Sequence, residues 1–579
     1  MARGEQVTLP SRRLAIVRLV FFIFFSFIVL RLFQLQVLNH TFYAALASGQ
    51  HDLFYKLMPK RGEVFVQDPL SKGKQSPVAI NQYLNLVYAS PKNVVDPNLA
   101  AGALTKLLEV PEEDLRQILS KPDDPWEPLK HAVTDEVVQN INNLKIAGIH
   151  TEPESVRYYP EGQTMSQLLG FVGFVGDRKQ GQYGIEGGWE KTLAGQQGQL
   201  RSEKDSGGSL ILLGKREITP AVDGASIVLS VDKNIQVRAC TALRAAVQRH
   251  GAAGGSVVIL EPSTGAIRAI CNSPSFDPNK YSEVDNLALF SDAAVSAAYE
   301  PGSVFKPFTM AAALEKHKVT PETTYVDTGE VKIGEDVIKN SDLKANGRQT
   351  MTQVLEASLN TGAIYAMRQV GLSEFAGFVR KFGFGALTGI ELPREHAGNI
   401  KSLNKRGEIF AATASFGQGI TVTPLQLAQA AGAIANQGRM MKPYVVQEIS
   451  YSDGRKQLTT PTLVRQVLTP EIATTLSAML VSVVEKGHGK RAGVPGYYVA
   501  GKTGTAEVPL SDGAGYDKNK NIGTFVGFAP VDQPRFVMVV KIDEPKDVVF
   551  AESSAAPLFG ELAKFLLEYY QVPPTREVK

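Results

Sequence analysis

Hydrophobic positions are most concentrated near the N-terminus, where residues 14–35 read LAIVRLVFFIFFSFIVLRLFQL with four polar interruptions. At about 1.5 Å per residue, a helix of this length spans roughly 33 Å, enough to cross the hydrocarbon core of a membrane. Arg18 and Arg31 lie near its ends, where long basic side chains can reach the headgroups. No second apolar run of this length occurs in the chain, so the pattern predicts a single transmembrane helix.

The charges that precede this run predict its orientation. Arg3, Arg12 and Arg13 stand against a single Glu5, and basic residues favour the cytoplasmic side. We therefore expect residues 1–13 in the cytoplasm and the rest of the chain outside. A cleaved signal peptide is the alternative, with ALA at residues 45–47 as the cleavage site, but that site lies farther from the apolar run than is usual.

The pattern of apolar residues divides the remaining chain into two parts. Residues 36–220 alternate short strands with helical stretches, which predicts a mixed α+β pedestal domain without a catalytic constellation. Residues 221–572 contain two strand–turn–strand patterns, at 256–271 and 523–542, with helical segments between and after them. We expect an α/β domain with a largely antiparallel sheet covered by helices, followed by a short tail, 573–579.

Composition excludes several classes of function. A chain of 579 residues with 44% apolar and 21% charged residues suits two or three folded domains. The net charge of +3 carries no block of like charges, so nucleic-acid binding is not expected. Two cysteines cannot form a disulfide framework, and we expect Cys240 and Cys271 to be small buried hydrophobic side chains. The histidines are scattered singly, so we expect neither a metal site nor a cofactor.

Four copies of the pattern S-x-x-K begin at Ser71, Ser303, Ser341 and Ser402. On a helix this spacing places an amine beside a hydroxyl, as an activated serine nucleophile requires. Only Ser303, in YEPGSVFKPFTMAAALEK, follows a Pro-Gly turn and precedes an apolar helical run. The pattern therefore predicts Ser303 at the N-terminus of a helix, with Lys306 on the same face; the other copies lie in loops.

Two more short patterns follow in order. S-x-N occurs at Ser358 and Asn360, within helix-forming sequence, and again at residues 402–404 in a charged loop. K-T-G occurs once, beginning at Lys502. Each pattern is weak alone, but S-x-x-K, S-x-N and K-T-G in this order, behind a membrane anchor, favour a penicillin-interacting serine enzyme.

The K-T-G segment also fits a phosphate-binding loop, because Gly496, Gly501, Lys502 and Thr503 spell G-x-x-x-x-G-K-T. A phosphate-binding loop continues into a helix. Here the intervening residues are Tyr-Tyr-Val-Ala, which favour an extended strand, and strand-like sequence follows. We therefore expect a strand and reject the nucleotide-binding interpretation.

With these boxes, the chain resembles a class B penicillin-binding protein, a monofunctional peptidoglycan transpeptidase. The segments EPSTGAIRAICNSPSFDPNKY and ASFGQGITVTPLQLAQAAGAIANQG, together with PKRGEVFVQD and RYYPEGQTMSQLLGFVG in the pedestal, are similar to family segments. Three positions depart from the family pattern: VQDPLSKGK replaces Asp-Arg-Asn-Gly after Gly62, Leu359 stands where Ser is usual, and Glu507 stands where Gln is common. The compact segment between the first two boxes is more similar to the cell-division (septal) branch than to the elongation branch.

The resemblance implies roles for the catalytic residues. Ser303 would attack the penultimate D-Ala carbonyl of a stem pentapeptide, with neutral Lys306 as its base. Ser358 would relay a proton between the lysines and the leaving amine, and Lys502 would face the substrate's terminal carboxylate.

The resemblance also implies a substrate-binding set. Asn360 would hold an amide of the substrate, and the strand through Thr503, Gly504 and Thr505 would bind the stem peptide as an added strand. Backbone N–H groups of Ser303 and Thr505 would form the oxyanion hole.

The implied setting is the bacterial plasma membrane, with one transmembrane pass and an extracytoplasmic catalytic domain. The implied partners are peptidoglycan stem peptides, β-lactams as covalent inhibitors, a membrane glycan polymerase of the shape and division type, and other division proteins. Two alternatives remain open on the same fold. A β-lactam hydrolase would need a water-activating carboxylate, but the candidate Glu356 overlaps the S-x-N box. A β-lactam sensor would bind without cross-linking.

Overall fold

The computed structural model describes residues 11–39, 52–69, 74–176, 178–203, 216–510 and 515–577. Arg3, Glu5, residues 45–47 and Ser71 lie outside the described residues. The chain forms two compact units: Met1–Lys60 with Gly195–Asp223, and Arg61–Ala194 with Gly224–Lys579.

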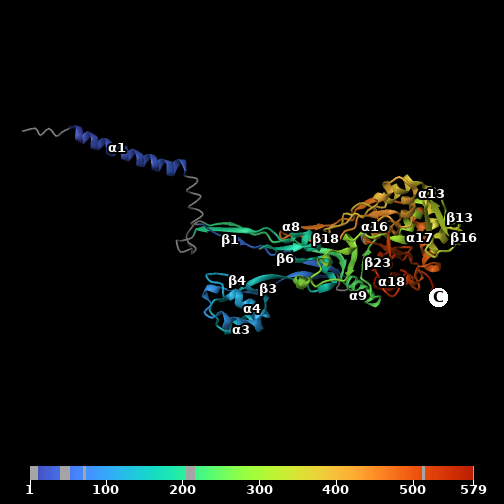
Figure 1. Cartoon of the computed structure of the whole chain (residues 1–579), viewed down its shortest axis with the longest axis horizontal. Helices are drawn as coiled ribbons and strands as arrows, with labels where there is room; N and C mark the ends of the chain where they lie inside the picture. The colour runs from blue at the N-terminus through green and yellow to red at the C-terminus, as the bar shows by residue number, and fades with distance from the viewer. Residues whose placement is uncertain are drawn as a thin grey trace, which may run out of the picture. The chain divides into compact units, whose positions relative to one another are not determined.

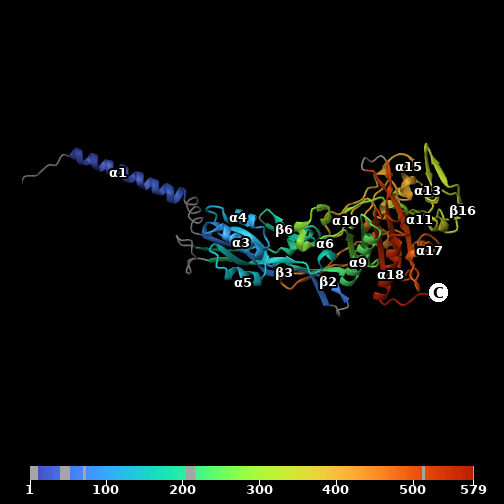
Figure 2. The same ribbon diagram turned by 60° about the horizontal axis from the view of Figure 1, so that its bottom comes forward.

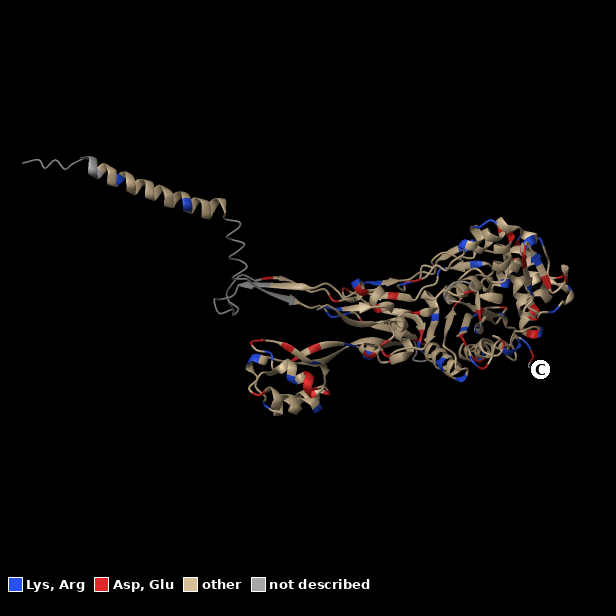
Figure 3. Cartoon of the chain, viewed as in Figure 1, with Lys and Arg blue, Asp and Glu red and all other residues tan. Residues whose placement is uncertain are grey.

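The first unit contains the apolar helix and a small sheet. Helix α1 (Ser11–Phe33) continues into a π-helical turn, η1 (Gln34–Leu38), and the stretch Ala15–Leu38 is long and apolar enough to cross a membrane. The sequence of α1 contains arginines and no acidic residue, and Figure 3 shows basic positions along the described helix. Strands β1 (Asp52–Leu57), β8 (Gly198–Glu203) and β9 (Arg216–Thr219) form an antiparallel sheet. The predicted single apolar N-terminal helix is confirmed.

The pedestal part of the second unit is built on a sheet whose strands come from distant parts of the chain. Its order is β19-β18-β10-β2-β3-β4, with β5 also pairing with β3. The strands are β2 (Val64–Asp68), β3 (Lys74–Ala89), β4 (Glu127–Val133), β5 (Ile149–Tyr158), β10 (Ser226–Asp232), β18 (Val446–Ser450) and β19 (Lys456–Leu458). Helices α3 (Pro97–Leu108), α4 (Glu112–Leu119) and α5 (Asp135–Asn143) share a separate core with β3 and β4.

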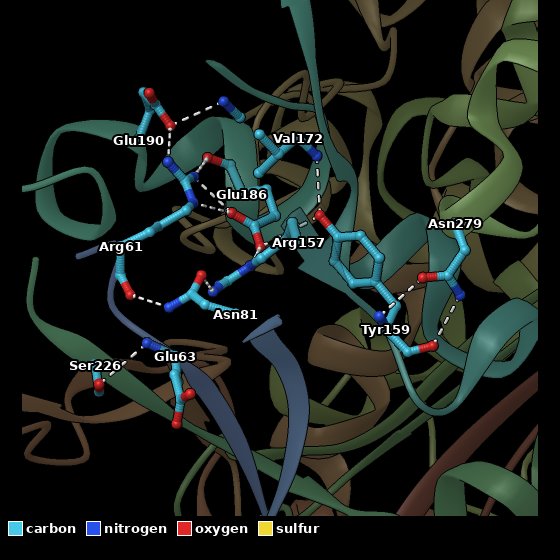
Figure 4. Close-up of polar contacts among 11 residues, drawn as sticks. Arg61, Glu63, Asn81, Arg157, Tyr159, Val172, Glu186, Glu190, Ser226 and Asn279 are labelled. Atoms are coloured by element: carbon cyan, nitrogen blue, oxygen red, sulfur yellow. Dashed lines mark hydrogen bonds and ion pairs between the residues drawn. The ribbon is translucent and has the colours of Figure 1, made fainter. Parts of the chain in front are cut away.

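A buried carboxylate, Glu186, lies at the centre of a polar network where this pedestal meets the catalytic domain (Figure 4). Arg61 Nη2 and Arg157 Nε contact it at 2.5 Å and 2.7 Å. Burial alone would raise the pKa of Glu186, but the charges of Arg157 and Arg61 overcome this and lower it. Tyr159 lies beside the carboxylate and exchanges backbone hydrogen bonds of 2.9 Å and 3.0 Å with the side chain of Asn279, a residue of the catalytic domain.

The catalytic domain is organised around a five-stranded antiparallel sheet of order β12-β11-β23-β22-β21. The strands are β11 (Gly254–Leu260), β12 (Ile267–Ser273), β21 (Ala500–Pro509), β22 (Tyr516–Ala529) and β23 (Phe536–Asp543). Both predicted strand–turn–strand patterns are therefore antiparallel hairpins, as expected from the Pro- and Gly-containing turns.

Helices cover both faces of this sheet. Helices α9 (Lys233–Arg249) and α18 (Ala555–Tyr569) lie side by side on one face (Figure 2). Helix α16 (Pro424–Ala435) packs on the other face, so that β23 lies between α16 and α18 (Figure 1). Beyond α16, the core of that face includes α11 (Lys306–Glu315), α13 (Asn360–Val370) and α17 (Pro470–Lys486). The predicted helix-covered antiparallel sheet is confirmed.

Shorter elements complete the second unit. The helices are α6 (Ser166–Leu169), α7 (Gly184–Gly188), α8 (Glu190–Leu193), α10 (Ala293–Ser296), α12 (Met351–Glu356), α14 (Leu372–Lys381) and α15 (Glu408–Ser415). The strand pairs are β6 (Phe171–Val175) with β7 (Arg178–Gln182), β13 (Thr324–Asp327) with β16 (Gly347–Thr350), β14 (Glu330–Ile333) with β15 (Asp336–Lys339), and β17 (Arg439–Met441) with β20 (Leu463–Gln466).

The two cysteines correct one expectation. Cys240 on α9 and Cys271 on β12 are both buried, as predicted, but they are joined in a disulfide with a Cα–Cα distance of 5.3 Å. One helical turn earlier, Gln236 fixes the helix on the strand by donating to the carbonyl of Ile270 at 2.8 Å and accepting from its N–H at 2.9 Å. The interpretation as two small hydrophobic side chains was wrong, because the docking of α9 on β12 brings together residues that are 31 positions apart.

Candidate active site

The three boxes meet in one cleft of about 270 Å³ in the catalytic domain. Its lining residues are Ser303, Asn340, Ser341, Asp342, Ala357, Ser358, Leu359, His488, Thr503, Thr505, Phe550 and Glu552. The cleft therefore contains the hydroxyl of the first box, the hydroxyl of the second and both threonines around the third.

Ser303 lies in a 3-10 turn, η7 (Gly302–Phe305), and the α-helix α11 begins at Lys306. The prediction of a helix N-terminus is thus correct to within one turn. Gly302 has φ +58°, a conformation that favours glycine, and its N–H donates to the carbonyl of Gly417 at 3.0 Å. Pro307 then occupies the first turn of α11, where its missing N–H costs nothing.

Lys306, the first residue of α11, is only 1% exposed. Its Nζ donates to the backbone carbonyl of Ser358 and, at 3.2 Å, to the Oγ of the same residue. Burial holds the pKa of Lys306 well below its ordinary value, and the nearby charge of Lys502 lowers it further. Both causes favour the neutral amine, which is the form that can accept a proton.

Ser358 occupies the two-helix junction between α12 and α13 with a left-handed backbone, φ +56°. This conformation is uncommon for a residue other than glycine. The following N–H, of Leu359, donates to the carbonyl of Val354 at 3.0 Å and closes the turn. The strained junction places the Ser358 hydroxyl between the two lysines.

Lys502 approaches the same hydroxyl from the sheet. It lies on β21, is 1% exposed, and its Nζ donates to the Oγ of Ser358 at 3.0 Å and to the carbonyl of Thr503 at 2.9 Å. Burial lowers the pKa of Lys502 to about 7. This lysine can therefore change its charge near neutral pH.

The remaining residues of the third box lie along β21, which is the edge strand of the described sheet. Thr503 and Thr505 line the cleft. The Thr505 Oγ1 accepts a hydrogen bond from the N–H of Ala551 at 3.0 Å, which leaves its own proton free to donate. A Cβ on Gly504 would lie 2.8 Å from the backbone N of Val304, so glycine lets the strand pass close to the nucleophile turn.

Asn360 begins α13, and its Nδ2 donates to the carbonyl of Lys339 at 2.9 Å. Among the described residues, it is not one of those that line the cleft. The amide therefore fixes the β15 segment beside the second box, and its predicted contact with substrate stays a prediction.

The competing copies of S-x-x-K differ in position. Ser341 lies in the loop after β15 and lines the cleft, whereas Ser402 lies in a separate 3-10 turn and donates to the carbonyl of Gly419 at 2.7 Å.

The Glu356 carboxylate accepts a hydrogen bond from Ser482 on α17. Its side chain is therefore bound to that helix, which argues against the water-activating role that a hydrolase would need.

Sequence reasoning missed one wall of the cleft. His488 follows α17, and Phe550 and Glu552 lie in the segment between β23 and α18. The Nδ1 of His488 lies 3.2 Å from Oε2 of Glu552. No short sequence pattern includes these residues. Along the chain, His488 lies shortly before β21, and Phe550 and Glu552 lie shortly after β23. Only this proximity in sequence could have suggested them.

The phosphate-binding alternative is excluded by local structure. Residues 500–509 form β21, and the next described element after it is β22, not a helix. Lys502 is buried on this strand rather than presented by a loop.

Comparisons with known proteins agree with this geometry. Residues 255–564 match the penicillin-binding protein transpeptidase domain, and residues 56–229 match the penicillin-binding protein dimerisation domain. The chain is 31% identical to stage V sporulation protein D of Bacillus subtilis over 99% of this chain and 88% of that one. It is 31% identical to the peptidoglycan D,D-transpeptidase FtsI of Escherichia coli K12 over 86% and 82%.

A similar structure is penicillin-binding protein 3 of Mycobacterium tuberculosis in complex with aztreonam. The TM-score is 0.70 at 25% identity, and the match covers 90% of this chain and 99% of that one. Both domains are matched in one chain, and Ser303, Ser358 and the K-T-G strand lie in one cleft. This protein therefore belongs to the class B penicillin-binding proteins and is a serine-type D,D-transpeptidase.

Proposed function

We propose that Ser303 is the acylated nucleophile and that the enzyme cross-links peptidoglycan stem peptides during septal wall synthesis. The observation that carries the residue assignment is the position of the Ser358 hydroxyl, which accepts from Lys306 at 3.2 Å and from Lys502 at 3.0 Å in the cleft that Ser303 lines. Two buried amines that converge on one hydroxyl form a path for protons beside a nucleophile.

In the first half of the reaction, neutral Lys306 takes the proton of Ser303 as its Oγ attacks the penultimate D-Ala carbonyl. The N–H groups of Ser303 and Thr505 stabilise the oxyanion. Ser358 passes the proton to the leaving amine and the C–N bond breaks. Terminal D-Ala departs, and the rest of the stem peptide remains bound to Ser303 as an ester. The low pKa of Lys306 supports its role as the base.

Substrate binding uses the free edge of the sheet. Because β21 is the edge strand, an extended stem peptide can pair with it. Thr503 and Thr505 border the cleft along this strand, and Lys502 supplies positive charge behind them for the terminal carboxylate. Asn360 would hold an amide of the stem from the opposite side.

The test is covalent labelling by a fluorescent penicillin. Wild-type protein should be labelled, and Ser303→Ala should abolish labelling. The matched control is Ser341→Ala, since Ser341 also begins an S-x-x-K pattern and lines the same cleft. Labelling that survives Ser303→Ala, or that is lost in Ser341→Ala, would contradict the assignment. Turnover of the penicillin would favour a hydrolase, and stable acylation without any cross-linking would favour a sensor.

The proposed topology places the catalytic domain outside the plasma membrane, with α1 as the anchor. The Cys240–Cys271 disulfide supports this placement, because disulfides persist in oxidising compartments. Protease added to spheroplasts should degrade the chain beyond about residue 36. Protection of the catalytic domain would overturn the topology.

The septal role rests on the sequence between the first two boxes and on the relationship to FtsI. The Bacillus relative is named for sporulation, so cell biology must decide among division, elongation and sporulation. A fluorescently tagged protein should gather at the septum of growing cells, together with a membrane glycan polymerase of the shape and division type. Uniform labelling of the side wall would favour the elongation role.

A further inference from the structure

Two residues of the cleft wall take no part in the acylation step proposed above. His488, which follows α17, and Glu552, between β23 and α18, both line the cleft with Ser303. His488 Nδ1 lies 3.2 Å from Glu552 Oε2, and the two side chains are 53% and 39% exposed. The pair is therefore open to a molecule that enters from solvent, unlike the lysines.

Both members of the pair are attached to the catalytic boxes. The N–H of His488 donates to the carbonyl of Glu356 at 3.3 Å, two residues before Ser358. The residue before Glu552, Ala551, donates its N–H to the Thr505 Oγ1 at 3.0 Å. The histidine and the carboxylate are thus held by the loop of the second box and by the strand of the third.

The second half of a transpeptidation needs a proton acceptor beyond those of the first half. An acceptor amine arrives mainly as an ammonium ion, because alkylamines titrate near pH 10. It must lose two protons to become the nitrogen of an amide. The Oγ of Ser303 takes one when its ester bond breaks, and the other needs a base near the cleft opening. Lys306 and Lys502 are each 1% exposed and both bind Ser358.

We infer that His488 and Glu552 form the site that binds the acceptor amine and removes its first proton. This inference rests on the proposed transpeptidase function. With Nδ1–H donating to Glu552, the imidazole has its lone pair on Nε2, as in sites where a carboxylate orients a histidine base. The negative charge of Glu552 attracts the ammonium group.

The ammonium gives one proton to Nε2 of His488, and the neutral nitrogen attacks the ester carbonyl on Ser303. The new C–N bond forms and the C–Oγ bond breaks. The second nitrogen proton passes through Ser358 to the Oγ of Ser303, and His488 releases its proton to solvent. The products are the cross-linked amide and free enzyme.

The other carboxylate of the cleft, Asp342, is less suited to this role. Its Oδ1 accepts from the N–H of Lys344 at 3.0 Å, and its Oδ2 accepts from the Nδ2 of Asn346 at 3.4 Å. These hydrogen bonds fix Asp342 within its own loop. Glu552 is instead bonded to an ionisable ring that can take up a proton.

The experiment measures how the acyl-enzyme divides between an amine and water. Full-length protein in detergent at about pH 6.5 receives an N-acyl-D-alanyl thioester as donor and D-alanine amide as acceptor. The α-amino group of this acceptor titrates near pH 8, so at the assay pH it is mainly an ammonium ion. The amide product is compared with the free acid. Each rate is divided by the acylation rate of the same variant. We expect His488→Gln to lower the ratio of transfer to hydrolysis on the order of 10²-fold. Glu552→Gln should raise the amine concentration for half-maximal transfer about tenfold or more.

Matched controls change the same residue types outside the cleft. His317→Gln replaces an exposed histidine after α11, and Glu561→Gln removes a carboxylate that pairs with Arg238 on the surface of α18. Both should keep the wild-type ratio. The inference is overturned if His488→Gln keeps the ratio of transfer to hydrolysis. In that case the two normalised rates are either both unchanged or both lowered equally. An equal fall would mean that the pair acts on water as much as on the amine. A wild-type protein that the donor does not acylate would overturn both this inference and the proposed function.

Discussion

Lys306 and Lys502 share one acceptor: each donates through its Nζ to the hydroxyl of Ser358, at 3.2 Å and 3.0 Å. They reach it from different elements, the first turn of α11 and the strand β21. Two nitrogens bound to one oxygen at a tetrahedral angle lie roughly 5 Å apart. At an effective dielectric constant of about 20, two unit charges at that distance repel by roughly 3 kcal/mol. This repulsion disfavours the state in which both lysines are charged at the same time.

Replacing Lys502 with Ala should therefore raise the pKa of Lys306. Burial remains the larger cause of its low pKa, and the charge of Lys502 is the second. Because the pKa of Lys502 is about 7, it is charged on the acid side of neutrality, where it opposes protonation of Lys306. The acid limb of the acylation rate should move to higher pH by about one to two units. The measurement is the pH profile of acylation by an uncharged donor.

The control for this variant is Lys541→Met. Lys541 is also a buried lysine of the same sheet, but it pairs with Asp543 and lies over the ring of Tyr299. Its removal should leave the acid limb unchanged. An acid limb that stays in place in Lys502→Ala would show that burial alone keeps Lys306 neutral.

Local patterns in the sequence predicted the elements that carry the boxes. The turn and apolar run after Ser303 predicted a helix N-terminus, and the residues before Lys502 predicted a strand. These predictions hold because helix and strand formation depend on neighbours a few residues away. The left-handed backbone of Ser358 was not predictable in this way, since it depends on how α12 and α13 pack.

Contacts between distant segments were beyond sequence reasoning. The Cys240–Cys271 disulfide requires α9 to dock on β12, and the His488–Glu552 pair requires the end of α17 to meet the segment before α18. Neither pair has a spacing that identifies it. The nearness of Gly504 to Val304 is similar, because only the passage of β21 beside the nucleophile turn explains why a glycine is needed there.

Gly504→Ala should disturb the nucleophile more than the fold. The added methyl would lie 2.8 Å from the backbone N of Val304 and 2.9 Å from the carbonyl of Pro301, so the strand or the turn must shift. Misplacement on the order of 1 Å costs about 10²-fold in rate, and we expect that loss in the acylation rate. Gly377→Ala on α14 is the control, since a methyl there meets no atom within 4 Å. Wild-type acylation by the Gly504 variant would show that the turn adapts freely.

The disulfide should stabilise the catalytic domain. Closing a loop of 31 residues in the unfolded chain corresponds to about 3–4 kcal/mol. Replacing Cys240 and Cys271 together with Ser should lower the free energy of unfolding by up to this amount, as measured by urea titration. A reductant present during unfolding should destabilise the wild type and leave the double variant unchanged. Equal curves for the wild type with and without reductant would indicate that the bond contributes nothing.

Asp292 should make stability depend on pH. Its Oδ1 accepts from Asn272 Nδ2 at 2.8 Å and from the N–H of Ala294 at 3.0 Å, whereas its Oδ2 has no hydrogen-bond partner among the described residues. Burial raises its pKa from 3.8 to about 6. The folded state therefore binds more protons than the unfolded state between these values, and stability falls as the pH rises through them.

The variant Asp292→Asn tests this dependence, because it removes the charge and keeps an oxygen for the two donors. Above pH 6 the full cost of the buried charge is present, about 3 kcal/mol for a shift of about two units. We expect the variant to be more stable than the wild type by up to this amount at pH 7.5, with the difference shrinking toward zero near pH 4. Asp285→Asn, an exposed carboxylate earlier in the same segment, should change neither value. Urea titrations at the two pH values decide the matter, and a difference that is the same at both would contradict the buried-charge explanation.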